Sequence, residues 1–323
     1  MNEKIELRSL GKTGIQVSPV GMGVMEFSGS KNGVFRFAFP FIPREDKNAI
    51  IQAAIAGGIN WFDTAEMYGL GESERALASA LKAAGKGDDE VVVATKWLPY
   101  LRTAENIPKT IDNRLQNLDG YSIDLYMIHQ PHSFSPPEAE MDAMADLVEA
   151  GKIRSVGVSN FNVERMSRAH AALAKRGLPL AANQMHYSLM AREIETNGVL
   201  DVAKELGITI TAYTPLESGL LTGKFHQNPE LLDKKPSMWR RRMQRKFEDS
   251  KPLIAAMEKI AVKYDATIAQ VALNWVINFQ GETVVTIPGA TKVYQVEQNA
   301  GAMKFKLSAD ELAQLDELSR AFR

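Results

Sequence analysis

The sequence predicts an α/β protein in which eight parallel strands and their helices form a (β/α)8 barrel, also called a TIM barrel. Eight short apolar runs alternate with longer segments of helical period, the order that parallel pairing through right-handed crossovers requires. The composition does not break along the 323 residues, and α/β barrels of this length commonly form one unit. We therefore expect a single domain over residues 1–323.

The eight runs are rich in Val, Ile and aromatic residues, as buried strands are. In chain order they are VGMGV from Val20, INWFD from Ile59, EVVVATK from Glu90, SIDLYMIH from Ser122, IRSVGVSN from Ile153, LAANQMH from Leu180, GITITAY from Gly207 and TVVTIPGA from Thr283. Helical segments such as residues 45–58 and 71–85 end on glycine, which helix C-termini favour. The alternative is a doubly wound open sheet, but the first run is not followed by the G-x-G-x-x-G turn typical of that fold.

The overall composition excludes several classes of protein. Apolar residues make up 45% and charged residues 24%, and the formal net charge of −1 argues against nucleic-acid binding and against an anionic membrane surface. The absence of cysteine excludes disulfides and thiolate chemistry. Because the N-terminus has no signal-peptide core and no apolar run approaches the ~20 residues of a membrane span, we expect a cytoplasmic protein.

Chemically active residues stand where the second, third and fourth runs end. Lys96 follows Asp63 by 33 residues, and His129 follows Lys96 by the same interval, one strand–helix unit each. A lone aspartate here would usually be a helix cap or a turn former. The C-terminal ends of barrel strands share one rim, where active sites are built, so the recurrence favours a common pocket. The next three runs also end on polar or aromatic residues: Ser159 and Asn160, Asn183 and Gln184, and Tyr213.

Together with Tyr68, five residues after Asp63, these side chains suit protonation of an oxyanion. A tyrosine has an ordinary pKa near ~10, and a neighbouring ammonium such as Lys96 would lower it. Asp63 would keep that ammonium charged in a partly buried site, and His129 would orient or polarise a carbonyl oxygen. Since no serine or cysteine stands beside a base, we expect carbonyl reduction with hydride from a nicotinamide cofactor.

These motifs resemble those of the aldo-keto reductases, over nearly the whole chain from LRSLGKTGIQVSPVGMG to VEQNAGAMKFKLS. NWFDTAEMYG, VVVATK and DLYMIHQPH match the regions of the family's catalytic tetrad, with Asp63, Tyr68, Lys96 and His129 in the matching positions. The resemblance is to NADP-dependent bacterial oxidoreductases of the potassium-channel β-subunit-like branch. It implies a barrel with an N-terminal β-hairpin cap, cofactor and substrate loops at the C-terminal face, and NADPH-dependent reduction of aldehydes or ketones with Tyr68 as general acid.

The resemblance also implies a binding site for the nicotinamide dinucleotide. GKIRSVGVSNF and NQMHYSLM match the segments around the nicotinamide carboxamide, YTPLESGLLTGK the stacking aromatic and the pyrophosphate turn 214–218, and TIPGATKVYQVEQNAGA the adenosine half. The implied cofactor-binding residues are Gly23, Val24, Met25, Asp63, Ser159, Asn160, Gln184, Tyr213, Thr214, Pro215, Leu216, Ser218, Leu221, Lys224, Ile287, Gly289, Ala290, Lys292, Gln295, Gln298 and Asn299.

The cofactor is expected to be NADPH, with NADH left open. A better-known branch of the family holds the 2′-phosphate with lysine and arginine, at positions that are Gly289 and Gln295 here. Lys292 is the nearest cation that could substitute, and an arginine of MWRRRMQRK is the alternative. His129 and His132 have the spacing of a metal pair, but with no third ligand we expect no metal.

Two further stretches and a second function class complete the expectations. The basic run 240–246 is predicted to be a solvated loop or a rim facing the cofactor rather than a nucleic-acid site. The Phe-rich stretch 28–43 is either a lid over the pocket or part of the neighbouring surface.

The expected partner is a small-molecule carbonyl substrate, and the oligomeric state stays open. The alternative function is an NADP(H)-binding regulatory or sensor subunit with slow turnover; a barrel isomerase or lyase would need other rim chemistry.

Overall fold

Eight parallel strands form the sheet of the protein in this computed structural model, which describes residues 5–29, 41–233 and 237–323. Each predicted run contains one of them. In order along both the chain and the sheet, they are β3 (Met22–Gly23), β4 (Trp61–Asp63), β5 (Val92–Trp97), β6 (Leu125–Ile128), β7 (Ser155–Ser159), β8 (Leu180–His186), β9 (Thr209–Tyr213) and β10 (Val284–Thr286).

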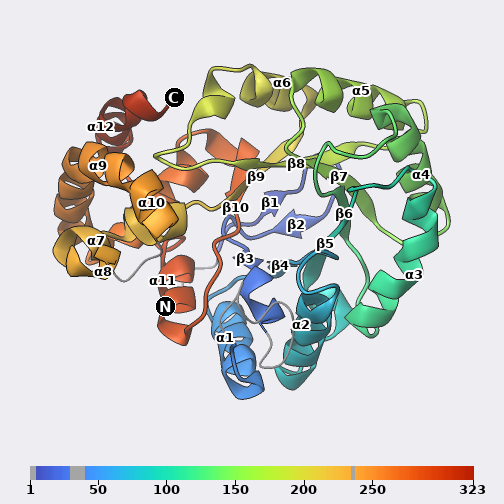
Figure 1. Ribbon diagram of the computed structural model, residues 1–323, viewed down its shortest axis with the longest axis horizontal. Coiled ribbons are helices and arrows are strands. Elements are labelled where there is room, and N and C mark those ends of the chain that lie inside the picture. The colour runs from blue at the N-terminus through green and yellow to red at the C-terminus, as the bar shows by residue number, and fades with distance from the viewer. Residues whose placement is uncertain (1–4, 30–40, 234–236) are drawn as a thin grey trace.

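The first and last strands of this sheet meet and close the barrel. Parallel bridges join Val20 to Thr286 and Gly23 to Gly289. The backbone N–H of Gly21 also donates to the carbonyl of Thr286 at 2.7 Å. The predicted (β/α)8 barrel is therefore confirmed, and Figure 1 shows its helices as a ring outside the strands.

Most of the strands are followed by a helix, and the capping residues of several helices are visible in the sequence. Before α10, the side chain of Thr267 accepts from the N–H of Gln270, whose own side chain accepts from the N–H of Thr267. The helices are α1 (Arg44–Ala56), α2 (Glu72–Ala83), α3 (Asn106–Leu118), α4 (Pro137–Glu149), α5 (Val163–Ala174), α6 (Val199–Leu206), α7 (Lys224–Gln227), α8 (Glu230–Asp233), α9 (Ser237–Lys263), α10 (Ile268–Asn278), α11 (Val293–Gly301) and α12 (Ala309–Ser319). Short 3-10 turns are η1 (Met25–Ser28), η3 (Asp88–Glu90), η4 (Glu193–Glu195), η5 (Glu217–Thr222), η6 (Gly281–Thr283) and η7 (Arg320–Phe322).

A two-stranded hairpin, β1 (Arg8–Ser9) and β2 (Gln16–Val17), closes the N-terminal end of the barrel. Its turn residue Gly11 has φ +56°, and its N–H donates to the Thr209 hydroxyl at 2.7 Å, where β9 begins. A Cβ on Gly11 would lie 2.5 Å from the carbonyl oxygen of Ala181, so only glycine fits here. This confirms the predicted hairpin cap, which lies across the middle of the strands in Figure 1.

The interior of the barrel is packed with side chains below the rim that carries the strand ends. Trp61 is fully buried there, and its indole N–H donates to the carbonyl of Ser18 at 2.9 Å. A Cβ on Gly21 would lie 2.3 Å from the Trp61 ring, which explains a glycine in the first run. The other members of this cluster are Leu10, Val17, Ala94, Leu125, Met127, Ala181, Ala182, Val285 and Ile287. These side chains therefore fill the barrel interior below the rim, and the C-terminal end is where active sites of this fold are built.

Two predictions about the stretches between strands need correction or lie outside the described residues. The basic run 240–246 was expected to be a solvated loop or a rim facing the cofactor, but it lies inside helix α9, because Arg, Met, Gln and Lys all have high helix propensity. Most of the Phe-rich stretch, residues 30–40, is outside the described part of the chain. In the parts that are described, no helix is long and apolar enough to cross a membrane.

Candidate active site

Four side chains from neighbouring strand ends meet at the C-terminal rim. Asp63 is the last residue of β4, Lys96 lies in β5, His129 follows β6, and Tyr68 stands in the turn after β4. The Lys96 Nζ is 2.5 Å from Asp63 Oδ1 and 5.1 Å from the centre of the Tyr68 ring. The rings of Tyr68 and His129 meet edge to face with centroids 5.5 Å apart. The structure thus brings together the tetrad that the sequence proposes.

Lys96 is fully buried and held by oxygen atoms. It donates to Asp63 Oδ1 and, at 2.9 Å, to the carbonyl of Thr64. The other carboxylate oxygen of Asp63 accepts from the Gln184 amide at 2.9 Å. Burial lowers the pKa of Lys96, and the Asp63 carboxylate opposes that effect. Asp63 is therefore the partner that favours the charged form of this buried amine.

Tyr68 differs from the expectation that a neighbouring ammonium lowers its pKa. Its pKa is raised well above the usual value, first by burial and then by the negative charges of Asp63 and Glu26. The reason is visible in the contacts of Lys96, whose hydrogen bonds go to Asp63 and Thr64 while its Nζ faces the ring of Tyr68. The phenol of Tyr68 therefore stays protonated at neutral pH.

His129 is a neutral imidazole in this setting. Burial, followed by the nearby charge of Lys96, lowers the pKa of His129 to about 3. Its ring also has a buried Nδ1 that finds no hydrogen-bond partner among the described residues. A neutral ring next to a tyrosine can donate or accept a hydrogen bond without adding charge to the site.

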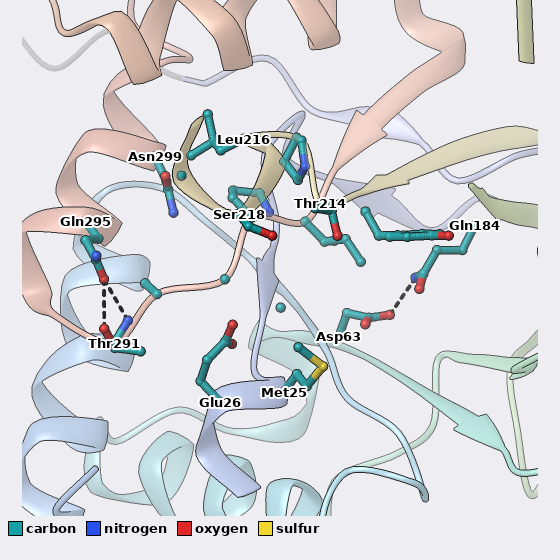
Figure 2. Close-up of a pocket in the computed structure, with 18 of the residues that line it drawn as sticks. Met25, Glu26, Asp63, Gln184, Thr214, Leu216, Ser218, Thr291, Gln295 and Asn299 are labelled. Carbon is teal, nitrogen blue, oxygen red and sulfur yellow. Dashed lines mark hydrogen bonds between the residues drawn. The ribbon is translucent and has the colours of Figure 1, made fainter. Parts of the chain in front are cut away.

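The tetrad borders a groove of about 1000 Å³ at the C-terminal rim (Figure 2). Tyr68, His129 and Asp63 are among the residues that line it. Of the residues predicted to bind the cofactor, those that line the groove are Gly23, Met25, Asp63, Ser159, Asn160, Gln184, Tyr213, Thr214, Pro215, Leu216, Ser218, Lys224, Ile287, Gly289, Ala290, Gln295, Gln298 and Asn299.

Three of the predicted cofactor-binding residues lie elsewhere. Val24 and Leu221 are fully buried beneath the groove residues next to them in the chain. Lys292 is exposed at the residue before α11, and its side chain does not line the groove. Its backbone N–H donates to the side chain of Gln295 at 3.1 Å, as does that of Thr291 at 2.8 Å. The start of α11 is thus fixed by Gln295 (Figure 2).

Polar side chains and one aromatic ring meet in the middle of the groove. The side-chain Nδ2 of Asn160 donates to the Ser159 hydroxyl at 3.0 Å. The Tyr213 hydroxyl donates to the side-chain Oδ1 of Asn160 at 3.0 Å. Asn160 takes a left-handed backbone, φ +59°, which asparagine tolerates better than most residues. This end of β7 and β9 therefore presents amide and hydroxyl groups beside the face of an aromatic ring.

A buried polar cluster supports Tyr213 from behind. The ring of His186 stacks on that of Tyr213 with centroids 5.4 Å apart and planes 13° apart. The carboxylate of Glu217 lies 2.7 Å from His186 Nε2 and accepts from the Ser188 hydroxyl at 2.9 Å and from Lys246 of α9 at 2.9 Å. Burial raises the pKa of Glu217, but the bonds from His186 and Lys246 outweigh it, and the net direction is down. The cluster ties α9 to the groove.

Several groove residues were not predicted from the sequence. Met67 and Gln130 stand next to Tyr68 and His129 in the chain, and that adjacency could have identified them. Gly219, Thr222, Pro288, Thr291 and Tyr294 lie inside the two matched cofactor segments, and Glu26 follows the predicted Met25, so position in the chain could also have identified them; Ala269 has no such signal. In the described residues, no group of three His, Asp or Glu side chains is arranged to hold a metal ion.

Comparison with known proteins gives one consistent result. Residues 19–320 match the model of the Aldo/keto reductase family. An uncharacterized oxidoreductase of Mycobacterium tuberculosis is 39% identical over 316 residues, covering 95% of this chain and 91% of the relative. A thermostable aldo-keto reductase in complex with the inhibitor epalrestat superposes with a TM-score of 0.77 at 29% identity, covering 97% of this chain and 99% of that one. An aldo-keto reductase from Klebsiella pneumoniae in complex with NADPH gives 0.74 at 27%, covering 96% and 94%.

Proposed function

The chain belongs to the aldo/keto reductase family, and from this membership we propose that it is an NADPH-dependent oxidoreductase that reduces aldehydes or ketones to alcohols. The observation that carries the proposal is the tetrad: an acid, Tyr68, stands beside a neutral His129 and above a buried Lys96–Asp63 pair, at the border of a large groove. Within the family, placement in the potassium-channel β-subunit-like branch stays a prediction.

The groove suits a nicotinamide dinucleotide together with a small substrate. Its volume of about 1000 Å³ is at the top of the range of roughly 300–1,000 Å³ for ligand pockets. Ser159, Asn160 and Gln184 would hold the carboxamide, and the Tyr213 ring would stack on the nicotinamide. Turn 214–218, rich in left-handed residues, and the 287–299 segment would hold the pyrophosphate and adenosine. When bound, the cofactor supplies the hydride.

The chain's own residues would supply the proton and hold the carbonyl. Tyr68 donates its phenolic proton to the carbonyl oxygen, because its raised pKa keeps it protonated through neutral pH. Neutral His129 offers a hydrogen bond to the same oxygen. As the proton leaves, the ammonium of Lys96 stabilises the phenolate, and Asp63 holds that ammonium in place. These side chains would thus stabilise the negative charge that develops on the carbonyl oxygen and then on the phenolate.

The proposal is tested by adding NADPH to the purified protein with a panel of aldehydes, ketones and quinones and following its oxidation by absorbance. Tyr68→Phe should lower turnover at least about a hundredfold, the scale of general acid catalysis, while the cofactor still binds. Tyr100→Phe is the matched control, since that exposed ring stacks on His132 outside the groove and should leave turnover unchanged. Near-normal turnover in Tyr68→Phe would refute the assignment. Tight NADPH binding without turnover of any substrate would favour the regulatory or sensor function.

Preference for NADPH over NADH is proposed to depend on Lys292. Its exposed ammonium stands at the start of α11, next to the groove residues Thr291 and Gln295, where a 2′-phosphate would gain a charge-assisted contact. Lys292→Ala should weaken NADPH binding by about 1–3 kcal/mol and leave NADH nearly unchanged. Fluorescence titration of both cofactors gives the four dissociation constants. Equal losses would show that Lys292 holds no phosphate, and Arg240 to Arg242 would be tested next.

A further inference from the structure

A carboxyl group lines the groove in which the cofactor is proposed to bind. Glu26 lies in η1, immediately after β3, and its side chain points into the open space below Ser218 (Figure 2). Asp63 lies to one side of it in Figure 2, and Gly289 of the 287–291 segment lies against it. Two phosphate groups are expected in this part of the groove, so a negatively charged side chain here calls for an explanation.

One oxygen of the Glu26 carboxyl is left without a partner by the described residues around it. Its Oε2 is buried and has no hydrogen-bond partner among the described residues. Both carboxyl oxygens would lie 2.7 Å from a Cβ on Gly289, so the glycine at that position leaves the space that the carboxyl fills. Burial raises the pKa of Glu26, and the N–H of its own backbone only partly offsets this. A ligand in the groove would therefore meet a carboxyl group with one oxygen that has no partner in the described part of the chain.

Within residues 5–29, 41–233 and 237–323, no ion pair joins Glu26 to a cation. Lys47 of α1, a cation on an adjacent element, donates its ammonium to the carbonyl of Phe27 at 2.7 Å. The charge of Glu26 contributes to the raised pKa of Tyr68, which places the two groups within electrostatic reach of each other. The titratable groups on the elements packed around the carboxyl are Lys47, Asp63, Tyr68, Glu72 and, from the loop after β9, Lys224.

A carboxylate and a pyrophosphate a few ångströms apart repel each other, and the energy is lowest when one of them takes up a proton. The carboxyl is the better candidate, since a diester pyrophosphate stays ionised while a buried carboxyl is already easier to protonate. A protonated carboxyl is a hydrogen-bond donor, and O–H···O⁻ bonds to a charged acceptor are short and strong.

We propose that Glu26 is a cofactor-contacting residue whose carboxylic acid form donates a hydrogen bond to a phosphate oxygen of the bound dinucleotide, so that binding takes up one proton from solvent. The inference rests on the proposed function, because it requires that a dinucleotide binds in this groove. It assigns to η1 a direct role in cofactor affinity and makes that affinity depend on pH.

The dissociation constant of NADP⁺ measured by calorimetry from pH 5.5 to 9 tests the inference. Above the pKa of the free carboxyl, the wild-type constant should rise by up to about tenfold per pH unit. Glu26→Gln keeps a hydrogen-bond donor but cannot titrate, so it should bind more tightly than wild type at pH 9 and lack this part of the slope. Calorimetry in two buffers of different ionisation enthalpy counts the protons taken up on binding. Glu26→Gln should take up fewer protons than wild type, by up to one per cofactor bound.

Two controls separate the contributions. The 2′-phosphate also titrates, near pH 6, but it does so equally in wild type and variant, so the difference between the two curves isolates Glu26. Glu297→Gln, an exposed residue of α11, removes the same charge outside the groove and should keep the wild-type slope. Thermal unfolding checks that both variants fold.

Equal slopes in wild type and Glu26→Gln would overturn the inference. So would weaker binding by Glu26→Gln at every pH, because the carboxylate would then be accepting a hydrogen bond, from a ribose hydroxyl for example. If NADP(H) binds to neither wild type nor variant, the proposed cofactor itself is wrong, an outcome that is distinct from both of these.

Discussion

At the scale of single residues, Lys96 and Tyr68 show how burial changes an argument made from residue types. From ordinary pKa values, an ammonium beside a phenol should make the phenol more acidic. In the structure, Lys96 donates its hydrogen bonds to Asp63 and Thr64, and burial is the largest effect on the pKa of Tyr68, which it raises. In the proposed mechanism, the lysine would therefore act on the phenolate that forms during reaction rather than on the resting phenol.

The Lys96–Asp63 pair should behave as a buried salt bridge. Lys96→Met leaves Asp63 as an uncompensated buried charge, so the free energy of unfolding should fall by about 3–5 kcal/mol and activity should collapse. Adding Asp63→Asn should restore much of the stability without restoring activity. Urea denaturation and steady-state rates measure the two effects. Lys82→Met, which breaks the exposed pair with Asp119, should cost less than about 1 kcal/mol. If Lys96→Met changes neither stability nor rate, the pairing has no energetic consequence.

At the scale of elements, the loop after β9 is held in an unusual backbone conformation. Thr214, Glu217 and Ser218 all have φ near +50°, which costs energy for residues other than glycine. The buried carboxylate of Glu217 offsets this conformational cost because it accepts hydrogen bonds from β8, from the turn after β8 and from α9. One side chain thus fixes both the turn that lines the groove and the His186 ring behind Tyr213.

Glu217→Gln should therefore affect stability and cofactor binding together. The amide cannot satisfy all the donors that the carboxylate does, so the free energy of unfolding should drop by about 2–3 kcal/mol. The dissociation constant of NADPH should rise as well, because the His186–Tyr213 stack loses its anchor. Chemical denaturation and fluorescence titration report the two quantities. Glu248→Gln in α9, which breaks only an exposed pair with Lys251, should change neither by more than about 0.5 kcal/mol. Loss of stability with unchanged affinity would show that the cluster does not support the groove.

At the scale of the whole molecule, the stability of the fold should depend on pH through His129. Its pKa is about 3 in the folded protein and about 6.5 when unfolded. Between these values the unfolded chain binds a proton that the folded one does not, so stability is complete above about pH 6.5 and is lost as the pH falls. The loss reaches up to about 1.4 kcal/mol per pH unit. Urea denaturation from pH 4.5 to 7.5 should show a shallower dependence in His129→Gln. Parallel curves would mean that His129 is not buried as neutral imidazole.

The barrel could be predicted from the sequence because its signals are local. Each strand is a short apolar run, and each rim residue, such as Asp63 or His129, stands directly at the end of one. Glu26 could not be predicted to matter, since only closure of the barrel brings it against Gly289. The helical state of residues 240–246 was missed because a run of cations has no apolar period, and packing of the later turns of α9 decides the conformation.

Closure of the barrel by β3 and β10 has a consequence for how the protein is made. These strands come from opposite ends of the chain, and the bridges from Val20 to Thr286 and from Gly23 to Gly289 are their seam. The groove crosses that seam, with Met25 and Glu26 on one side and residues 287–299 on the other. A nascent chain still lacking β10 has the tetrad but lacks the side of the groove that residues 287–299 form. Contacts of such long sequence separation form late in folding. The complete groove, which a dinucleotide would occupy, therefore does not exist until β10 and residues 287–299 have been synthesised.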